Sequence, residues 1–109
     1  MAYDEALADR IREQLAARSE LSERKMFGGI GFMIAGKMAV GVIGEDLIVR
    51  LDPADAEKAL AEDGVREFDF TGRPMKGWIF VAPERTAGEE GLAEWVEAGA
   101  DYAASLPAK

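Results

Sequence analysis

The chain has 109 residues, of which 49% are hydrophobic and 31% are charged, and its formal net charge is −8. A chain of this length can bury one hydrophobic core, so we expect a single domain over residues 1–109 that needs no disulfide or metal to fold. The absence of cysteine and histidine excludes disulfides, thiol nucleophiles, thiolate metal sites and histidine acid–base catalysis.

Helical periodicity begins close to the N-terminus. A helix is predicted over residues 3–18, because apolar side chains recur there every four residues and share one face: Tyr3, Leu7, Ile11 and Leu15. The first ten residues are charged and lack an apolar core, so they do not form a secretory signal. The longest apolar run, residues 28–36, is much shorter than the ~20 residues of a membrane-spanning helix. We therefore expect a cytoplasmic protein without membrane contact.

Short strands are predicted after this helix. They cover residues 25–27, 30–34, 38–43 and 47–51, and glycine-containing turns separate them. Apolar side chains alternate along most of these segments, as in strands with one buried face. Runs and turns of these lengths are typical of a meander of antiparallel hairpins.

A second helix is predicted where the strands end. Asp52 is a good N-cap, Pro53 suits the first helical position, and Gly64 supplies a stop. Two further strands follow, over residues 65–70 and 77–82. The second of them carries large apolar side chains on both faces, so we expect both of its faces to be buried: Trp78 and Phe80 on one, Ile79 and Val81 on the other.

The last helix is predicted to open with a capping box, from Thr86 to Glu89, and to end at Pro107. Its apolar spacing places Trp95 on the buried face. The element order is therefore one helix, three or four strands, a helix, two strands and a helix. This order predicts an α+β fold, with helices over one face of a mainly antiparallel sheet.

Charge is distributed unevenly along the chain. Residues 52–69 hold seven acidic and two basic groups, a net of −5, and residues 86–109 have a net of −4. Residues 21–51 have a net of +1 and residues 70–85 a net of +2. The acid thus concentrates in the later helices and the base in the strand segments. The overall negative charge makes direct nucleic-acid binding unlikely to be the main activity, because phosphate contacts dominate that affinity.

Two segments are candidates for binding an anion or a partner. Gly28 and Gly29 belong to a glycine-rich stretch that could cradle an anion through its backbone or form a bulge or tight bend; no helix follows it, so no phosphate-loop or dinucleotide motif is present. Arg73 and Lys76 flank Pro74 between glycines, which presents two cations on a shaped loop or on an ordinary hairpin connection. Lys25 joins this candidate set, and Arg50 would also do so if the strands are neighbours.

No catalytic constellation is present, and the sequence indicates no enzyme, no cofactor and no metal site. The carboxylates are accounted for by helix caps, helix ends and solvated faces, with Asp52 and Glu89 as examples. The serine and threonine hydroxyls have no histidine to activate them. Trp78 and Trp95 lie on apolar faces, where core packing is the favoured interpretation.

Two segments support a family resemblance. Residues 25–29, Lys-Met-Phe-Gly-Gly, and residues 69–78, from Asp69 to Trp78, resemble the two signatures of the TfoX N-terminal domain family. The resemblance covers essentially the whole chain, including the Ser-Leu-Pro ending at residues 105–107. It implies a two-layer sandwich with a bent antiparallel sheet, and it brings no catalytic residues.

The resemblance also implies a link to regulation, because named members of the family regulate natural competence for DNA uptake. Those longer regulators carry a second domain resembling helix–hairpin–helix DNA-binding modules, and this sequence stops at Lys109 without one. We therefore expect a stand-alone domain.

Three hypotheses about function are open at this stage. The first is a non-enzymatic regulatory module, a transcription-related coregulator whose acidic helices bind a basic protein partner. The second is a binder of a small anionic ligand at Gly28, Gly29, Arg73 and Lys76. The third, which we rank last, is direct binding of nucleic acid through the basic strand segments. The sequence also leaves open whether two copies pair as a homodimer.

Overall fold

The computed structural model describes residues 3–26, 28–68 and 76–106. Its strands form one antiparallel sheet in the order β1-β2-β3-β4-β6-β5. The strands are β1 (Leu21–Met26), β2 (Gly29–Ile34), β3 (Lys37–Ile43), β4 (Asp46–Arg50), β5 (Val65–Glu67) and β6 (Trp78–Val81). The helices are α1 (Glu5–Leu15), α2 (Pro53–Ala59), α3 (Pro83–Thr86) and α4 (Glu89–Ser105). The predicted α+β fold and its order of strands and helices are confirmed.

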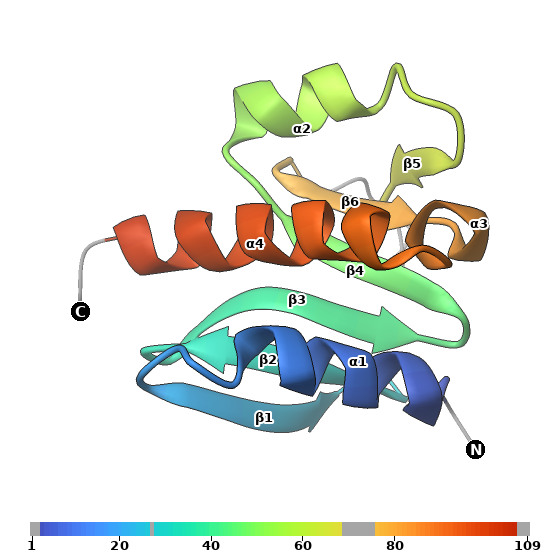
Figure 1. Cartoon of the computed structure of the whole chain (residues 1–109). Helices are drawn as coiled ribbons and strands as arrows, with labels where there is room; N and C mark the ends of the chain where they lie inside the picture. Colours follow the sequence, from blue (N-terminus) through green and yellow to red (C-terminus); the bar gives the residue numbers. More distant parts are fainter. Residues whose placement is uncertain (1–2, 27, 69–75, 107–109) are drawn as a thin grey trace.

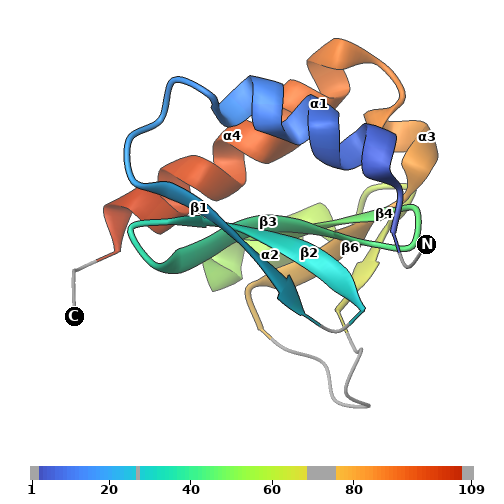
Figure 2. The ribbon, with the colours of Figure 1, turned by 90° about the horizontal axis from the view of Figure 1, so that it is seen from below.

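Helices α1 and α4 lie beside each other over one face of the sheet (Figures 1 and 2). Together with that face they enclose the larger of two apolar clusters, which we call the helix-side core. Its largest fully buried side chains come from both layers and include Ile11, Leu15, Phe32, Leu47, Ile79 and Leu92. Helix α2 packs against β6 and adds Ala56 and Ala59 to the same core. One face of the sheet therefore anchors the helices, as the alternation of apolar residues predicted.

Helix α1 begins at Glu5, two residues later than predicted, and Asp4 is its N-cap. The carboxylate of Asp4 accepts a hydrogen bond from the backbone N–H of Leu7 at 3.1 Å, which satisfies one of the free donors at the helix start. Tyr3, predicted to lie in the helix, instead forms an isolated bridge with Gly44. The predicted buried face is otherwise confirmed, because Leu7, Ile11 and Leu15 are all buried.

Strand β1 is longer than the predicted segment of residues 25–27. It begins at Leu21 and pairs with β2 along its whole length, from Leu21 opposite Ile34 to Met26 opposite Gly29. Its first four residues were missed because β1 is an edge strand whose residues 22–25 are all exposed. Such a segment shows no apolar alternation for sequence analysis to detect.

The opposite face of the sheet carries a second apolar group, which we call the outer cluster. Its buried members are Met38, Ile48, Phe68 and Phe80, and Met33, Ile43 and Trp78 pack against them half-buried. The Phe68 and Phe80 rings lie 5.0 Å apart between centroids. Strand β6 thus contributes to both apolar groups, which confirms the prediction that both of its faces are buried.

The predicted capping box at the start of the last helix is wrong. Thr86 belongs to the short helix α3, where it is buried and its hydroxyl donates to the carbonyl oxygen of Pro83 at 3.1 Å. Gly88 is the N-cap of α4, and no side chain caps that end. The predicted box failed because Pro83 starts a helical turn first, and the threonine hydroxyl is engaged within that turn.

Trp95 tests the helix-side core. It is only 9% exposed, so Trp95→Ala should lower the free energy of unfolding by about 3–5 kcal/mol through lost burial and a cavity. Urea unfolding followed by circular dichroism measures this loss. The neighbouring exposed residue provides a control, since Glu94→Gln should change stability by less than about 0.5 kcal/mol. A near-neutral Trp95→Ala variant would contradict the burial of this ring.

Gly99 tests the close approach of α4 to β3. A Cβ atom at this position would lie 2.6 Å from the carbonyl oxygen of Ala39. We expect Gly99→Ala to destabilise the protein by about 1–3 kcal/mol, although alanine is the better helix former, because backbone must shift to admit the methyl group. Glu94→Gln, an exposed change in the same helix, is the control and should change stability by less than about 0.5 kcal/mol. Equal melting temperatures for the two variants would contradict this packing.

Candidate functional site

The structure does not gather the candidate binding residues into one site. Lys25, Gly28 and Gly29 lie around the β1–β2 hairpin, whereas Lys76 lies two residues before β6. Four strand spacings separate β1 from β6 in the sheet, which is about 19 Å. The register also aligns Lys25 with the end of β6 that is farther from Lys76. Arg73 lies outside the described residues.

The two glycines of the hairpin have structural roles. Gly28 has a φ of +76°, a conformation that residues with a side chain rarely adopt. A Cβ on Gly29 would lie 2.0 Å from the carbonyl oxygen of Val42, so β2 could not approach β3 there with any other residue. These constraints account for glycine at both positions without a ligand, and they favour the tight-bend interpretation over the anion cradle.

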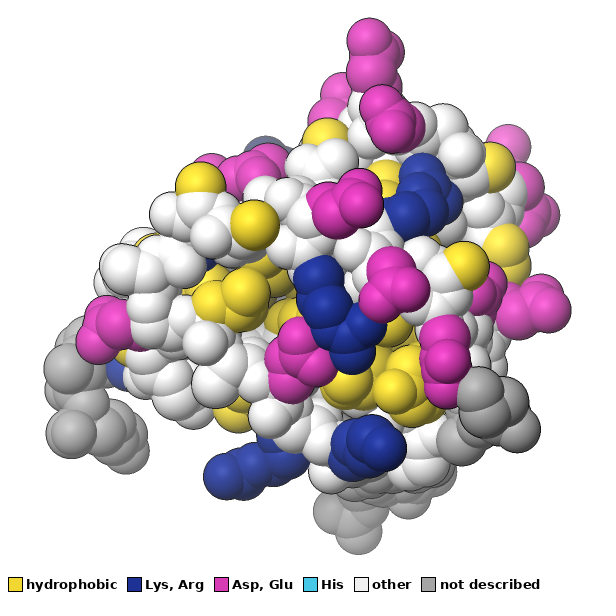
Figure 3. All heavy atoms as spheres, turned by 60° about the horizontal axis from the view of Figure 1, so that its bottom comes forward, with side chains coloured by type: hydrophobic (Ala, Val, Ile, Leu, Met, Phe, Trp, Pro, Cys, Tyr) yellow, Lys and Arg dark blue, Asp and Glu magenta, His cyan; other side chains and the backbone are white. Residues whose placement is uncertain are grey.

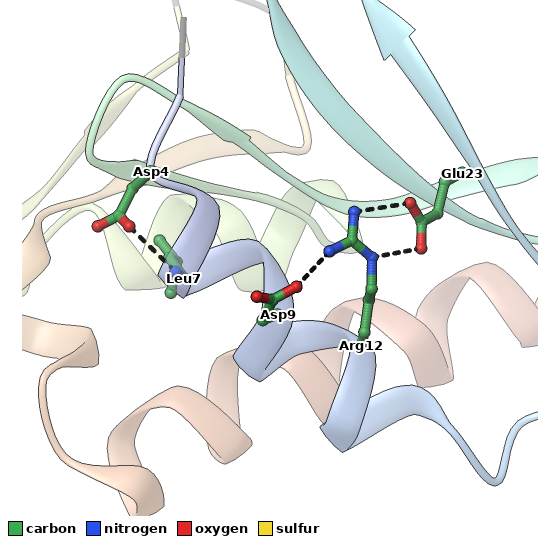
Figure 4. Close-up of polar contacts among 5 residues, drawn as sticks. All are labelled: Asp4, Leu7, Asp9, Arg12 and Glu23. Carbon is green, nitrogen blue, oxygen red and sulfur yellow. Dashed lines mark hydrogen bonds and ion pairs between the residues drawn. The ribbon is translucent and has the colours of Figure 1, made fainter. Parts of the chain in front are cut away.

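Most arginines near the helices are paired with carboxylates. Arg12 of α1 binds both oxygens of Glu23 on β1, at 2.7 and 3.0 Å, and also reaches Asp9 (Figure 4). Hydrogen bonding to Glu23 is the main reason that the pKa of Arg12 is raised above its ordinary value. Because the three charged groups satisfy one another, Arg12 is not available to an anionic ligand.

Two further arginines connect separate elements in the same way. Arg18 binds Asp101 at 2.6 Å and Glu97 at 2.5 Å, and hydrogen bonds to these two carboxylates of α4 raise its pKa. Arg85 binds Glu62 at 2.8 Å. The face shown in Figure 3 agrees with this pairing, since its basic side chains lie separately among acidic and apolar ones and form no continuous patch.

Helix α4 carries the largest excess of negative charge. Its residues Glu89–Ser105 include five carboxylates and no basic group. Glu97 and Asp101 are paired with Arg18, but three others are exposed and form no ion pair within the described residues: Glu89, Glu90 and Glu94. The predicted concentration of acid in the last helix is thus displayed on an accessible surface.

A groove of ≈ 370 Å³ lies between α2 and the adjoining ends of β5 and β6. Its volume falls in the range typical of ligand sites. Apolar side chains form most of its walls, and three charged side chains reach it from different elements. The lining residues are Pro53, Ala54, Ala56, Glu57, Leu60, Glu67, Lys76, Gly77, Trp78 and Ile79.

The backbone at Gly77 fixes the end of this groove that lies before β6. Gly77 has a φ of +87°, and its carbonyl oxygen accepts a hydrogen bond from the N–H of Leu51 at 2.7 Å. This turn sets the half-buried Trp78 in the groove wall. The Arg50 guanidinium lies over the Trp78 ring at 5.2 Å and near the Tyr102 ring of α4 at 5.8 Å, so it links the groove to α4.

Lys76, one of the predicted candidates, lines this groove, but the groove itself was not predicted. Trp78, for which core packing was favoured, packs half-buried against the outer cluster and also lines the groove. The groove depends on how α2 packs over β6, which no local pattern encodes. The conditional prediction for Arg50 is partly met, because Arg50 is paired with Trp78, two residues after Lys76.

The described part of the chain carries neither a metal-binding cluster nor a membrane-spanning helix. No group of three or more histidine, cysteine, aspartate or glutamate side chains is placed there to hold a metal ion. Among the same residues, no helix is long and apolar enough to cross a membrane.

Comparison with known proteins identifies the family. The family model of the TfoX N-terminal domain matches residues 13–103. The chain belongs to this family. The matched range includes the sheet, the groove beside α2 and nearly all of α4, so the TfoX N-terminal domain accounts for most of the fold described above. No curated protein and no solved structure matches the chain.

The two tryptophans provide a test of the open groove. Trp78 is half-buried in the groove wall and Trp95 is buried in the helix-side core. We expect the Trp95→Phe variant, which retains only Trp78, to emit at longer wavelength than Trp78→Phe and to be quenched more by acrylamide, because water and quencher reach an exposed indole. Fluorescence of the two folded variants measures both properties. Equal quenching would show that the groove is closed in solution.

Proposed function

We propose that this protein is a non-enzymatic protein-binding module that presents the acidic surface of α4 to a basic partner. The observation that carries the proposal is the charge of this helix, with five carboxylates and no cation. Three of these carboxylates, on Glu89, Glu90 and Glu94, are exposed and unpaired within the described part of the chain. They are the groups that a basic partner would contact.

A structural role explains only some of these charges. Glu89 and Glu90 lie in the first turn of α4, where carboxylates stabilise the positive end of the helix dipole. Glu94 lies in the second turn, beyond the range of that effect. Arg18 pairs only with carboxylates farther along the helix. Arg10 lies at Ala87 and Arg85 at the Trp95 ring, but neither forms an ion pair with Glu89, Glu90 or Glu94 within the described residues.

The charge of the whole protein supports the same choice of partner. A net charge of −8 repels nucleic acid and attracts a basic surface, and such long-range attraction speeds association more than it strengthens the final complex. We propose further that the partner is a component of transcription, in line with the regulatory members of the family. Proteins that bind DNA present basic surfaces, which an acidic helix complements.

Neutralising α4 should abolish capture of such a partner. The test variant is Glu89→Gln/Glu90→Gln/Glu94→Gln, which keeps the shape of the side chains and removes three charges. The control variant, Glu5→Gln/Glu13→Gln/Glu45→Gln, makes the same change in net charge at exposed positions away from α4. Each protein is used as bait in cell lysate, and the bound proteins are quantified by mass spectrometry at low and high salt.

The expected result is a basic protein that wild type and control retain, that the α4 variant loses, and that high salt releases. Equal retention by the two variants would show that α4 is not the binding surface. Failure of every bait to enrich a basic protein would contradict the proposed function.

A further inference from the structure

The groove beside α2 combines an apolar channel with charged groups at its borders. Pro53 and Leu60 line it from the α2 side, and Trp78 and Ile79 line it from β6. Glu57 of α2, Glu67 of β5 and Lys76, two residues before β6, also line it. A ligand suited to this groove therefore combines an apolar surface with a charged group.

The balance of charge determines which sign the ligand carries. Glu57 and Glu67 outnumber Lys76 among the lining side chains, and all three are exposed. None of them forms an ion pair within the described residues. A second cation lies close by, because the Arg50 guanidinium is over the Trp78 ring at 5.2 Å, although Arg50 does not line the groove. The preference for a cation therefore rests on the two exposed lining carboxylates and on the negative field of the whole chain.

Trp78 adds a second reason to expect a cation. Its ring already attracts one cation, the Arg50 guanidinium, which lies 5.2 Å from the ring centroid. Aromatic faces attract guanidinium and ammonium groups, and the aliphatic stems of arginine and lysine pack well on apolar walls. An indole next to two unpaired carboxylates is therefore suited to a long basic side chain.

We infer that this groove receives an arginine or lysine side chain of the protein partner, with its aliphatic stem along Leu60 and Trp78 and its cation between Glu57 and Glu67. The inference rests on the proposed function, because it assigns an anchor residue to the same basic partner. Arg50 also lies near the Tyr102 ring, close to the C-terminal end of α4, so the groove is a contact site separate from Glu89, Glu90 and Glu94. This assignment differs from the anion-binding hypothesis for Lys76 that the sequence suggested, because two carboxylates line the same groove as Lys76.

A pair of matched peptides tests the inference without knowledge of the partner. The probe is an acetylated and amidated pentapeptide with a central arginine between two leucines, and its control has citrulline, which keeps the shape of arginine and lacks its charge. Each is titrated into the millimolar range against ¹⁵N-labelled protein, with the indole N–H signal of Trp78 as the reporter. The Trp95→Phe variant assigns that signal.

The arginine peptide should shift the Trp78 signal and bind about tenfold more tightly than the citrulline peptide. Glu57→Gln/Glu67→Gln should remove this preference, whereas Lys76→Gln should strengthen arginine binding by removing a like charge. Glu13→Gln, an exposed change on α1, should leave it unchanged. Opposite effects of the groove variants cannot result from misfolding, and the dispersed amide spectrum of each variant verifies that it is folded.

Several outcomes would overturn the inference. They are the absence of any Trp78 shift, equal binding of the two peptides, and tighter binding of a third peptide with a central glutamate, which would instead assign the groove to an anion through Lys76. The fate of the proposed function is separate. If capture of the partner depends on α4 and is unaffected by Glu57→Gln/Glu67→Gln, the binding module stands and only the anchor groove is wrong.

Discussion

The contact on which the rest of the structure depends is the close approach of α4 to β3 at Gly99. Because a hydrogen atom replaces the side chain there, the helix rests directly on the strand backbone at Ala39. This depth lets Trp95 and Val96 enter the helix-side core and allows α1 to pack alongside. The packing at Gly99 thus decides which side of α4, and therefore which of its carboxylates, faces solvent.

Two arginines on α1 and in the turn after it form ion pairs, whereas several carboxylates on other elements stay unpaired within the described residues. Arg12 and Arg18 connect α1 and the turn after it to β1 and α4, and each uses two carboxylates to do so. Exposed ion pairs of this kind add little stability individually. They do leave these arginines less able to bind an anionic ligand. What remains accessible is an excess of carboxylates on α4 and at the groove beside α2. The exposed charge of these two surfaces is therefore mostly negative, although 13 of the 34 charged residues of the chain are basic.

Much of the fold could be predicted from local patterns. Asp52 and Pro53 marked the start of α2, and alternation along β2, β4 and β6 identified their buried faces. Predictions failed where tertiary context decided the outcome: the exposed edge strand β1 shows no alternation, and Thr86 was engaged inside α3. The candidate site was harder to predict. Lys25 on β1 and Lys76 before β6 are close to strands that lie far apart in the sheet. Glu57, Glu67 and Trp78 line one groove only because α2 packs over β6.

Strand β1 has a consequence for the behaviour of many copies together. It forms an outer edge of the sheet and is six residues long. An edge of this kind presents unpaired backbone N–H and C=O groups with which a strand of another molecule can pair. Here Glu23, Arg24 and Lys25 are all exposed along that edge, and Arg12 holds Glu23 in place. An incoming strand would have to desolvate these charges before it could pair. These charged residues removed the apolar alternation by which β1 could have been predicted. The same charges oppose edge-to-edge pairing of two sheets, which is a route to aggregation.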